Sequence, residues 1–196
     1  MARPSKKDQR REEIVDAFRR CVIRWGVAGA TLQRVANESG LARPLIHHNL
    51  GNRDDLLEAL LSRLEEESDT QIQELKSYLP NKNRCAALVN LLFDPQYASG
   101  AQETLLYQAL FASAQDSARL RKILLRWQDD FIEELAVELR SEYPMAAKKQ
   151  VAAVAVGIAA LYFHADSISP LSSDTKAFRL TGQAANTLLE SLSWNG

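Results

Sequence analysis

The sequence has few turn-forming residues, few β-branched runs and only two cysteines. It contains only six prolines and eight glycines in 196 residues, and Ala, Leu, Glu, Arg and Gln dominate over β-branched runs. The two cysteines, Cys21 and Cys85, are isolated, so neither a disulfide framework nor a cysteine metal site can be assembled. This composition predicts an all-α protein and is consistent with a reducing cytoplasm.

No long uninterrupted hydrophobic run is present either. The first apolar stretch, residues 14–27, is interrupted by Asp16, Arg19, Arg20 and Arg24, which excludes the apolar core of a signal peptide. The most apolar window, residues 151–165, is shorter than the roughly 20 residues that a membrane span requires. We therefore expect a cytoplasmic protein without a membrane partner.

Charge is divided unevenly along the chain, although the net charge is only −1. Residues 1–53 carry eleven Lys and Arg residues against five Asp and Glu residues, a net +6, and the remaining 143 residues carry −7. Such an asymmetry indicates a part that binds a polyanion, joined to a part with a different task.

Apolar periodicity and turn residues predict about nine helices. The first three are short and occupy the basic segment, the fourth is a long amphipathic helix that ends at Pro80, and five more follow. The expected ranges are about 8–25, 32–39, 42–50, 53–79, 82–93, 101–114, 117–142, 146–168 and 175–193.

The second and third helices form a helix-turn-helix. Thr31 is a candidate N-cap, Gly40 makes the tight turn, and Pro44 suits the first turn of the third helix. In this motif the later of the two helices, here the third helix of the chain, lies in the DNA major groove. A solvated polar face is the alternative for an arbitrary helix, but the basic segment favours DNA. We expect contacts with duplex DNA from Lys6, Lys7, Arg10, Thr31, Gln33, Arg34, Arg43, Pro44, His47, His48, Asn49 and Arg53.

The adjacent pair His47 and His48 does not fit a metal site. Neighbouring helical positions diverge by about 100°, whereas chelation uses i, i+3 or i, i+4 spacing. No metal or cofactor is expected. The two imidazoles either contact phosphate in their charged form or read base edges in their neutral form, and the sequence leaves both open.

The segment from Ile14 to Leu60 resembles the DNA-binding region of TetR-type transcriptional repressors. The matching positions are Ile14, Ala17, Phe18, Gly26, Thr31, Val35, Ala36, Gly40, Leu41, Ile46, His47, Leu50, Arg53, Asp54, Asp55 and Leu56. The resemblance implies a DNA-binding domain at 1–52 and a ligand-binding, dimerising helical domain at 53–196. His47 stands where the family usually has a tyrosine that touches the DNA backbone, which puts the detail of that contact in doubt.

Aromatic residues in the later helices suggest a pocket for a largely apolar or aromatic effector. Plain core packing is the alternative for each of them. The candidate pocket residues are Tyr107, Gln108, Phe111, Trp127, Phe131, Tyr162 and His164.

Three acids on one later helix, Asp130, Glu134 and Glu138, have the i, i+4 spacing seen in di-metal bundles. Those bundles also need Glu-x-x-His partners on other helices, and the sequence has none. The acids are therefore interpreted as a solvated face, and no enzymatic activity is expected.

The stretch of residues 151–165 is apolar all round and rich in Ala, Gly and Val. Such a helix must be covered on every side, which favours a homodimer contact over the central helix of a monomer. The resemblance implies the same two C-terminal helices in a four-helix contact. The expected interface residues are Val154, Ile158, Leu161, Phe178, Thr181, Ala185, Leu188 and Leu192.

Together these observations predict a homodimeric, ligand-responsive regulator, a repressor that binds a palindromic operator and is released by a small molecule. The alternative is a helical carrier or enzyme for small apolar molecules with a vestigial basic head.

Overall fold

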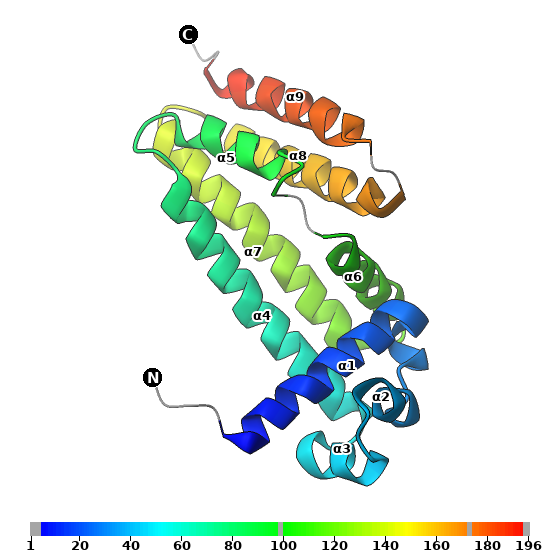
Figure 1. Cartoon of the computed structure of the whole chain (residues 1–196). Helices are drawn as coiled ribbons and strands as arrows, with labels where there is room; N and C mark the ends of the chain where they lie inside the picture. The colour runs from blue at the N-terminus through cyan, green and yellow to red at the C-terminus, as the bar shows by residue number, and fades with distance from the viewer. Residues whose placement is uncertain (1–4, 98–99, 172–173, 194–196) are drawn as a thin grey trace. The chain divides into compact units, whose positions relative to one another are not determined.

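The computed structural model describes residues 5–97, 100–171 and 174–193, and within these ranges the chain is helical with no strand. The α-helices, shown in Figure 1, are α1 (Lys6–Gly29), α2 (Leu32–Ser39), α3 (Arg43–Leu50), α4 (Arg53–Tyr78), α5 (Arg84–Leu92), α6 (Ala101–Ser113), α7 (Ala118–Glu142), α8 (Lys148–Ile168) and α9 (Lys176–Glu190). Two 3₁₀ turns, η1 (Ser169–Leu171) and η2 (Ser191–Ser193), follow α8 and α9. The predicted all-α class is confirmed.

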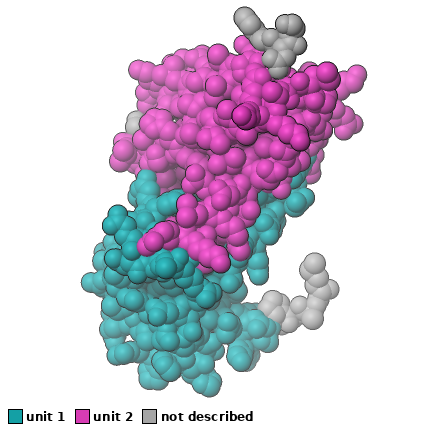
Figure 2. All heavy atoms as spheres, turned by 180° about the vertical axis from the view of Figure 1, so that it is seen from behind, with its two compact units in different colours: residues 1–76, 105–120 teal, residues 77–104, 121–196 magenta. Residues whose placement is uncertain are grey.

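The chain forms two compact units, coloured separately in Figure 2. Unit 1 comprises residues 1–76 and 105–120, and unit 2 comprises residues 77–104 and 121–196. The predicted functional boundary at residue 53 therefore falls inside unit 1, because α4 as far as Lys76 groups with α1, α2 and α3. The division into a DNA-binding and a ligand-binding part remains a prediction.

Unit 1 is built on a continuous apolar core. α1 packs on both α2 and α3, and α2 packs on α3. The core side chains are no more than 4% exposed and come from all four helices: Ile14, Val15, Ala17, Phe18, Cys21, Val22, Val35, Ile46, Leu56, Leu60, Leu61 and Leu64. At about 1.5–3 kcal/mol for each large side chain, this burial holds the short helices α2 and α3, which are too short to be stable alone.

Local capping fixes where these helices begin and end. Thr31 accepts a hydrogen bond from the Arg34 backbone N–H at 3.3 Å, and Gly40 ends α2 in the left-handed conformation at φ 71°. Asn52 Oδ1 accepts from the Asp55 backbone N–H at 3.2 Å, and Asp55 Oδ2 accepts in return from the Asn52 backbone N–H at 2.8 Å. This reciprocal pair is a capping box, and it starts α4 immediately after α3.

Gly26 interrupts α1 near its end, since its backbone is non-helical at φ 70° and ψ 170°. The chain then makes one further turn before Ala30. The sequence had predicted that Gly26 and Gly29 terminate the first helix. The structure agrees on Gly26 and adds a short helical turn to Gly29.

Unit 2 is organised around the close packing of α8 and α9. A Cβ added at Gly157 of α8 would lie 2.7 Å from Leu188 Cδ1, and one added at Gly182 of α9 would lie 2.9 Å from Phe93 Cβ. At Gly182 a larger residue would collide with the Cβ of Phe93, whereas at Gly157 it would meet only the end of the flexible Leu188 side chain, which can move aside.

A charged contact joins α5 to α7 in the same unit. Arg84 makes a bidentate ion pair with Glu138, with Nε–Oε2 at 3.0 Å and Nη2–Oε1 at 3.2 Å. Glu142 accepts from the Cys85 backbone N–H at 2.8 Å and caps the start of α5. Because the Glu138 side chain is only 14% exposed, the prediction that it belongs to a solvated face was wrong.

One helical segment, Lys148–Leu171, has the length and apolar composition of a membrane span. It is the only such segment within the described residues, and a third of its apolar window is buried inside the chain. Its buried side packs on α9, as expected of a core helix, and its other side carries exposed apolar residues that are considered below.

Candidate DNA-binding surface

The outward face of α3 is polar and exposed, whereas its inward face is buried. Ile46 is fully buried and Leu50 is 7% exposed, and both point into the unit 1 core. Arg43, Pro44, His47 and His48 are all exposed. Their i, i+4 spacing places Arg43 with His47, and Pro44 with His48, on adjoining rows of the free face. A short helix with its apolar side anchored and its donor-bearing side free has the features needed to enter a major groove.

Arg11 holds the end of α3 in place. Its Nη1 donates to the Asn49 carbonyl at 2.9 Å, across 38 residues of sequence. The carbonyls of the last turn have no partner within a helix, and they also carry the negative end of the helix dipole, so a guanidinium is favourable there. Arg11 is not among the predicted residues, because nothing in the spacing of the sequence shows which arginine of α1 reaches α3.

Asn49 has a partner within its own helix. Its side chain is half-buried, and Nδ2 donates to the Leu45 carbonyl of the same helix at 2.7 Å. In this structure the Asn49 amide nitrogen bonds within α3, and the predicted contact with a base edge remains a prediction.

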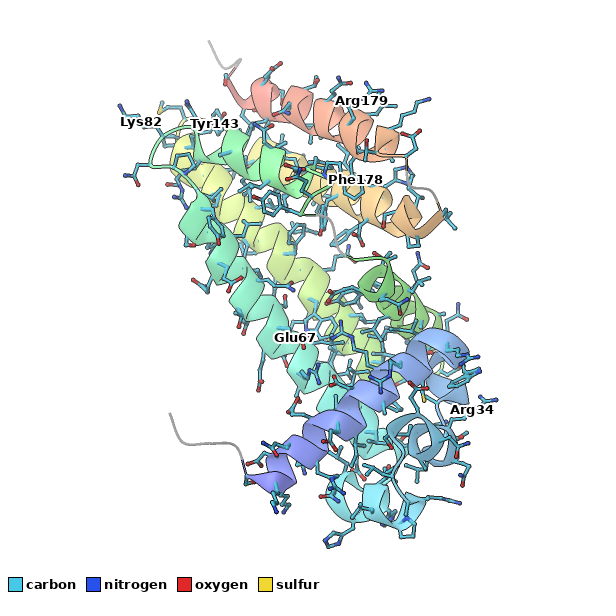
Figure 3. The ribbon with its side chains drawn as sticks, in the orientation of Figure 1. Arg34, Glu67, Lys82, Tyr143, Phe178 and Arg179 are labelled. Carbon is cyan, nitrogen blue, oxygen red and sulfur yellow. The ribbon has the colours of Figure 1, made fainter. Side chains whose placement is uncertain are left out.

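Arg34 is exposed but its guanidinium is already engaged. Nη1 donates to the Gly29 carbonyl at 2.7 Å, and the guanidinium carbon lies 4.8 Å from the centre of the Trp25 ring. Arg24 lies at the same distance from that ring. Figure 3 labels Arg34 at the edge of unit 1. The stack fixes the position of two cations beside the start of α2, where the N–H groups of a helix N-terminus favour anions.

The remaining predicted contacts are on the surface. Lys6 and Lys7 are exposed in the first turn of α1, which Ser5 and Asp8 close with a capping box. Arg10 is paired with Glu13 at 3.6 Å. Thr31 and Gln33 are exposed at the start of α2, and the Gln33 side chain donates to Asn37 Oδ1. Arg53, at the start of α4, lies 3.7 Å from Asp54. All of these DNA contacts remain predictions.

The predicted effector residues divide between the two units. Tyr107, Gln108 and Phe111 belong to unit 1, and Phe111 is 54% exposed. Trp127, Phe131, Tyr162 and His164 belong to unit 2.

Within unit 2 an aromatic cluster surrounds Tyr162. The ring centroids of Phe131, Phe93 and Phe163 lie 5.5, 6.3 and 5.8 Å from its own. Phe93 and Phe163 were not in the predicted set: Phe163 directly follows Tyr162 in the sequence and was overlooked, whereas the proximity of Phe93, 69 residues earlier, depends on tertiary packing.

A hollow of about 490 Å³ also lies in unit 2, between the ends of α8 and α9. Its lining includes Pro95, Phe178 and Thr181, and His164 is the one predicted effector residue in it. The hollow has a volume typical of small-molecule sites. The effector residues remain predictions.

The predicted dimer residues require correction. Val154, Ile158, Phe178, Thr181, Ala185 and Leu192 are at most 8% exposed within the single chain, and Leu161 and Leu188 are half-buried. The first six are therefore already covered and can add almost no area to a contact with a second chain.

A different stripe on each of the same two helices is exposed. On α8 it contains Ala152, Val156, Ala160 and Phe163, and on α9 it contains Leu180, Ala184 and Thr187. The sequence could not separate these stripes because α8 is apolar all round.

The sequence and the fold of this chain were compared with those of known proteins. No family model matches the chain. The HTH-type transcriptional regulator BetI of Rhizobium meliloti is 28% identical over 145 residues, which is 73% of this chain and 70% of that protein. The regulator of the same name from Brucella canis is 29% identical over 117 residues, and this chain spans only 58% of its length.

Solved structures match over nearly the whole chain. A transcriptional regulator from Pseudomonas aeruginosa PAO1 superposes with a TM-score of 0.81 at 18% identity, covering 97% of this chain and 93% of that one. A TetR-family regulator from a Rhodococcus species gives a TM-score of 0.71 at 19% identity, covering 92% and 99%. The fold is that of the TetR family. The resemblance predicted from residues 14–60 is therefore confirmed.

One further structural neighbour was solved with a small molecule. This regulator, from Saccharomonospora viridis, was crystallised in complex with choline and gives a TM-score of 0.72 at 19% identity over 93% of this chain and 96% of that one.

Proposed function

We propose that this chain is a TetR-type transcriptional regulator that binds duplex DNA through α3 and responds to a small molecule. The observation that carries the proposal is the free face of α3, with Arg43, His47 and His48 exposed inside a segment of net charge +6. Phosphate attraction supplies most of the affinity of such a surface, and a guanidinium that reaches guanine supplies discrimination between sequences.

The functional form is a homodimer. The exposed stripes of α8 and α9, with Val156 50% and Leu180 46% exposed, are the apolar surface that a second copy would cover. A two-fold dimer presents two α3 helices, and the operator is then palindromic with half-sites about one helical turn apart.

The effector binds in the helical part of the chain that follows the head. Choline, the ligand of the Saccharomonospora neighbour, is the first probe to test. Aromatic rings attract quaternary ammonium groups, and the cluster of Phe93, Phe131, Tyr162 and Phe163 offers such rings. The effector lowers DNA affinity and relieves repression only to the extent that it binds the DNA-free conformation more tightly than the DNA-bound one. No turnover is required, and the protein acts in the cytoplasm on DNA.

The test begins with selection of binding sequences from random duplexes, followed by gel retardation at about 150 mM salt. We expect recovery of a palindrome, and the variant Arg43→Ala should lose about 1–3 kcal/mol on it while binding random DNA as before. Arg126→Ala is the matched control, since Arg126 is an exposed arginine of unit 2 that lies 3.9 Å from Asp130. Failure to enrich any sequence, together with turnover or tight binding of an apolar compound, would favour the carrier or enzyme instead.

A further inference from the structure

A network of ion pairs joins α1 to α4 within unit 1. Arg63 of α4 uses all three guanidinium nitrogens: Nη2 lies 2.7 Å from Asp16 Oδ1, Nε lies 2.8 Å from Glu67 Oε1, and Nη1 lies 3.2 Å from Glu12 Oε2. The second oxygen of Glu67 accepts from Arg19 Nη1 at 3.2 Å. Two arginines and three carboxylates are thus connected without interruption.

The spacing of these residues fits a crossing of two helices. Glu12, Asp16 and Arg19 lie at i, i+4 and i+7 on one face of α1, and Arg63 and Glu67 lie one turn apart on α4. Figure 3 labels Glu67 on α4 where α1 passes over it. The ion pairs that Arg63 makes with α1 go to Glu12 and Asp16, and Glu67 of α4 pairs with Arg19 of α1.

The network is partly shielded from water. The side chains of Arg63 and Arg19 are 24% and 20% exposed, whereas Glu12 is 66% exposed. Burial by itself would lower the pKa of Arg63, but the hydrogen bonds to Glu67 and Asp16 outweigh it and raise the pKa, so the guanidinium stays charged. An isolated surface pair contributes little to stability, but a planar guanidinium that forks between carboxylates fixes direction as well as distance.

The position of α1 matters because α1 also holds the recognition helix. Arg11, next to Glu12, donates to the Asn49 carbonyl at the end of α3. α4 is therefore connected through Arg63 to α1, and α1 is connected through Arg11 to α3.

We infer that Arg63 is a positioning residue for DNA recognition: its guanidinium sets the orientation of α1 on α4, and so the presentation of α3 to the major groove. The inference rests on the proposed function. It differs from a purely structural role, which would change the folded fraction but leave the specificity of the folded protein intact.

The most direct variant is Arg63→Lys, which keeps the charge but loses the fork. At a temperature where circular dichroism shows full folding, we expect its affinity for the selected duplex to fall about tenfold, and its affinity for random duplex to stay within about twofold of wild type. Arg140→Lys is the control, because Arg140 makes an exposed pair with Glu133 and lies in unit 2.

A milder pair of variants separates the Arg63 contact from the change in charge. Glu12→Gln and Glu13→Gln remove one negative charge each from neighbouring exposed positions, so both gain nonspecific attraction to phosphate, which the ratio of selected to random affinity cancels. Only Glu12 contacts Arg63; Glu13 pairs with Arg10. The ratio of selected to random affinity should fall two- to threefold in Glu12→Gln relative to Glu13→Gln.

The outcomes distinguish the two ideas. If wild type enriches a duplex and both Arg63→Lys and Glu12→Gln keep the full ratio of selected to random affinity, the positioning role is overturned and the proposed function stands. If Arg63→Lys does not fold, the comparison of Glu12→Gln with Glu13→Gln decides by itself. If wild type enriches no duplex, the proposed function fails, and the positioning role fails with it.

Discussion

Gly51 is the position where the link between α3 and α4 can be tested most sharply. Its φ of 87° and ψ of −140° lie close to a region that only glycine occupies readily. A Cβ built on Gly51 would lie 2.3 Å from Asp55 Oδ2 and 2.9 Å from Asp55 Cγ. Gly51→Ala therefore strains the backbone and also displaces the side chain that caps α4.

The expected cost follows from those two effects. Backbone strain contributes about 1–3 kcal/mol, and loss of the Asp55 bond to the Asn52 N–H contributes about 1 kcal/mol. The reduced freedom of the unfolded chain returns about 0.4–1 kcal/mol. The net loss is about 1–3.5 kcal/mol, a large share of the stability of a small unit.

Gly40→Ala is the matched control. Gly40 also has a positive φ, 71°, but it is in the left-handed helical region and nothing lies within 4 Å of its would-be Cβ. This substitution should cost only about 1 kcal/mol after the same unfolded-state correction. Gly51→Ala should therefore lose more than Gly40→Ala, and the difference combines the less favourable backbone region of Gly51 with its collision with Asp55.

Amide hydrogen exchange is a suitable assay, because it reports the opening free energy of α3 and α4 separately from that of unit 2. Combining Gly51→Ala with Asp55→Ala should cost less than the sum of the single variants, since the closest contacts disappear and only the 3.2 Å approach to the Asp55 Cβ remains. Equal losses in Gly51→Ala and Gly40→Ala, or strict additivity in the double variant, would refute this account of the turn.

The other predictions concern pH, thiol chemistry and assembly. If either histidine of α3 contacts phosphate, operator affinity should rise as the pH falls from about 8 to 6. The double variant His47→Gln, His48→Gln should remove that rise. If wild-type affinity does not depend on pH, the rings are instead neutral and read base edges. Burial raises the pKa of the Cys85 thiol to about 12, so it should resist iodoacetamide at pH 8.5 in the native protein and react on unfolding; rapid native alkylation would contradict its burial. Light scattering should show that Val156→Glu converts the dimer to a folded monomer. Val137→Glu, on α7 and similarly exposed at 47%, should leave the dimer intact. A monomeric wild type would contradict the proposed interface.

Helix positions were predicted well because their signals are local. Thr31, Gly40, Pro44 and Asn52 mark helix ends through hydrogen bonds and backbone angles that depend on a few neighbouring residues. The predicted ranges of α2, α3 and α7 agree with the structure to within one residue. The charge asymmetry that separates the head from the rest is likewise a property of the chain itself.

Interhelical partners were not predicted, because long side chains can reach several neighbours and the sequence does not select among them. The bond from Asn49 to Leu45 was not expected, and Glu138 was expected to be solvated but pairs with Arg84. The Arg63 network depends on the crossing of α1 over α4, which joins residues 51 positions apart.

The sequence by itself determined the helical class, the helix-turn-helix, the basic segment and the resemblance to TetR-type regulators, because periodicity, capping and charge are encoded over short distances. Tertiary structure decided which apolar side of α8 and α9 is covered and which is exposed. The reason is that the hydrophobic effect is non-directional, so a helix that is apolar all round does not specify which of its sides will be buried. Only the packing of other helices decides this, and on α8 it leaves Val154 and Ile158 buried and Val156 exposed.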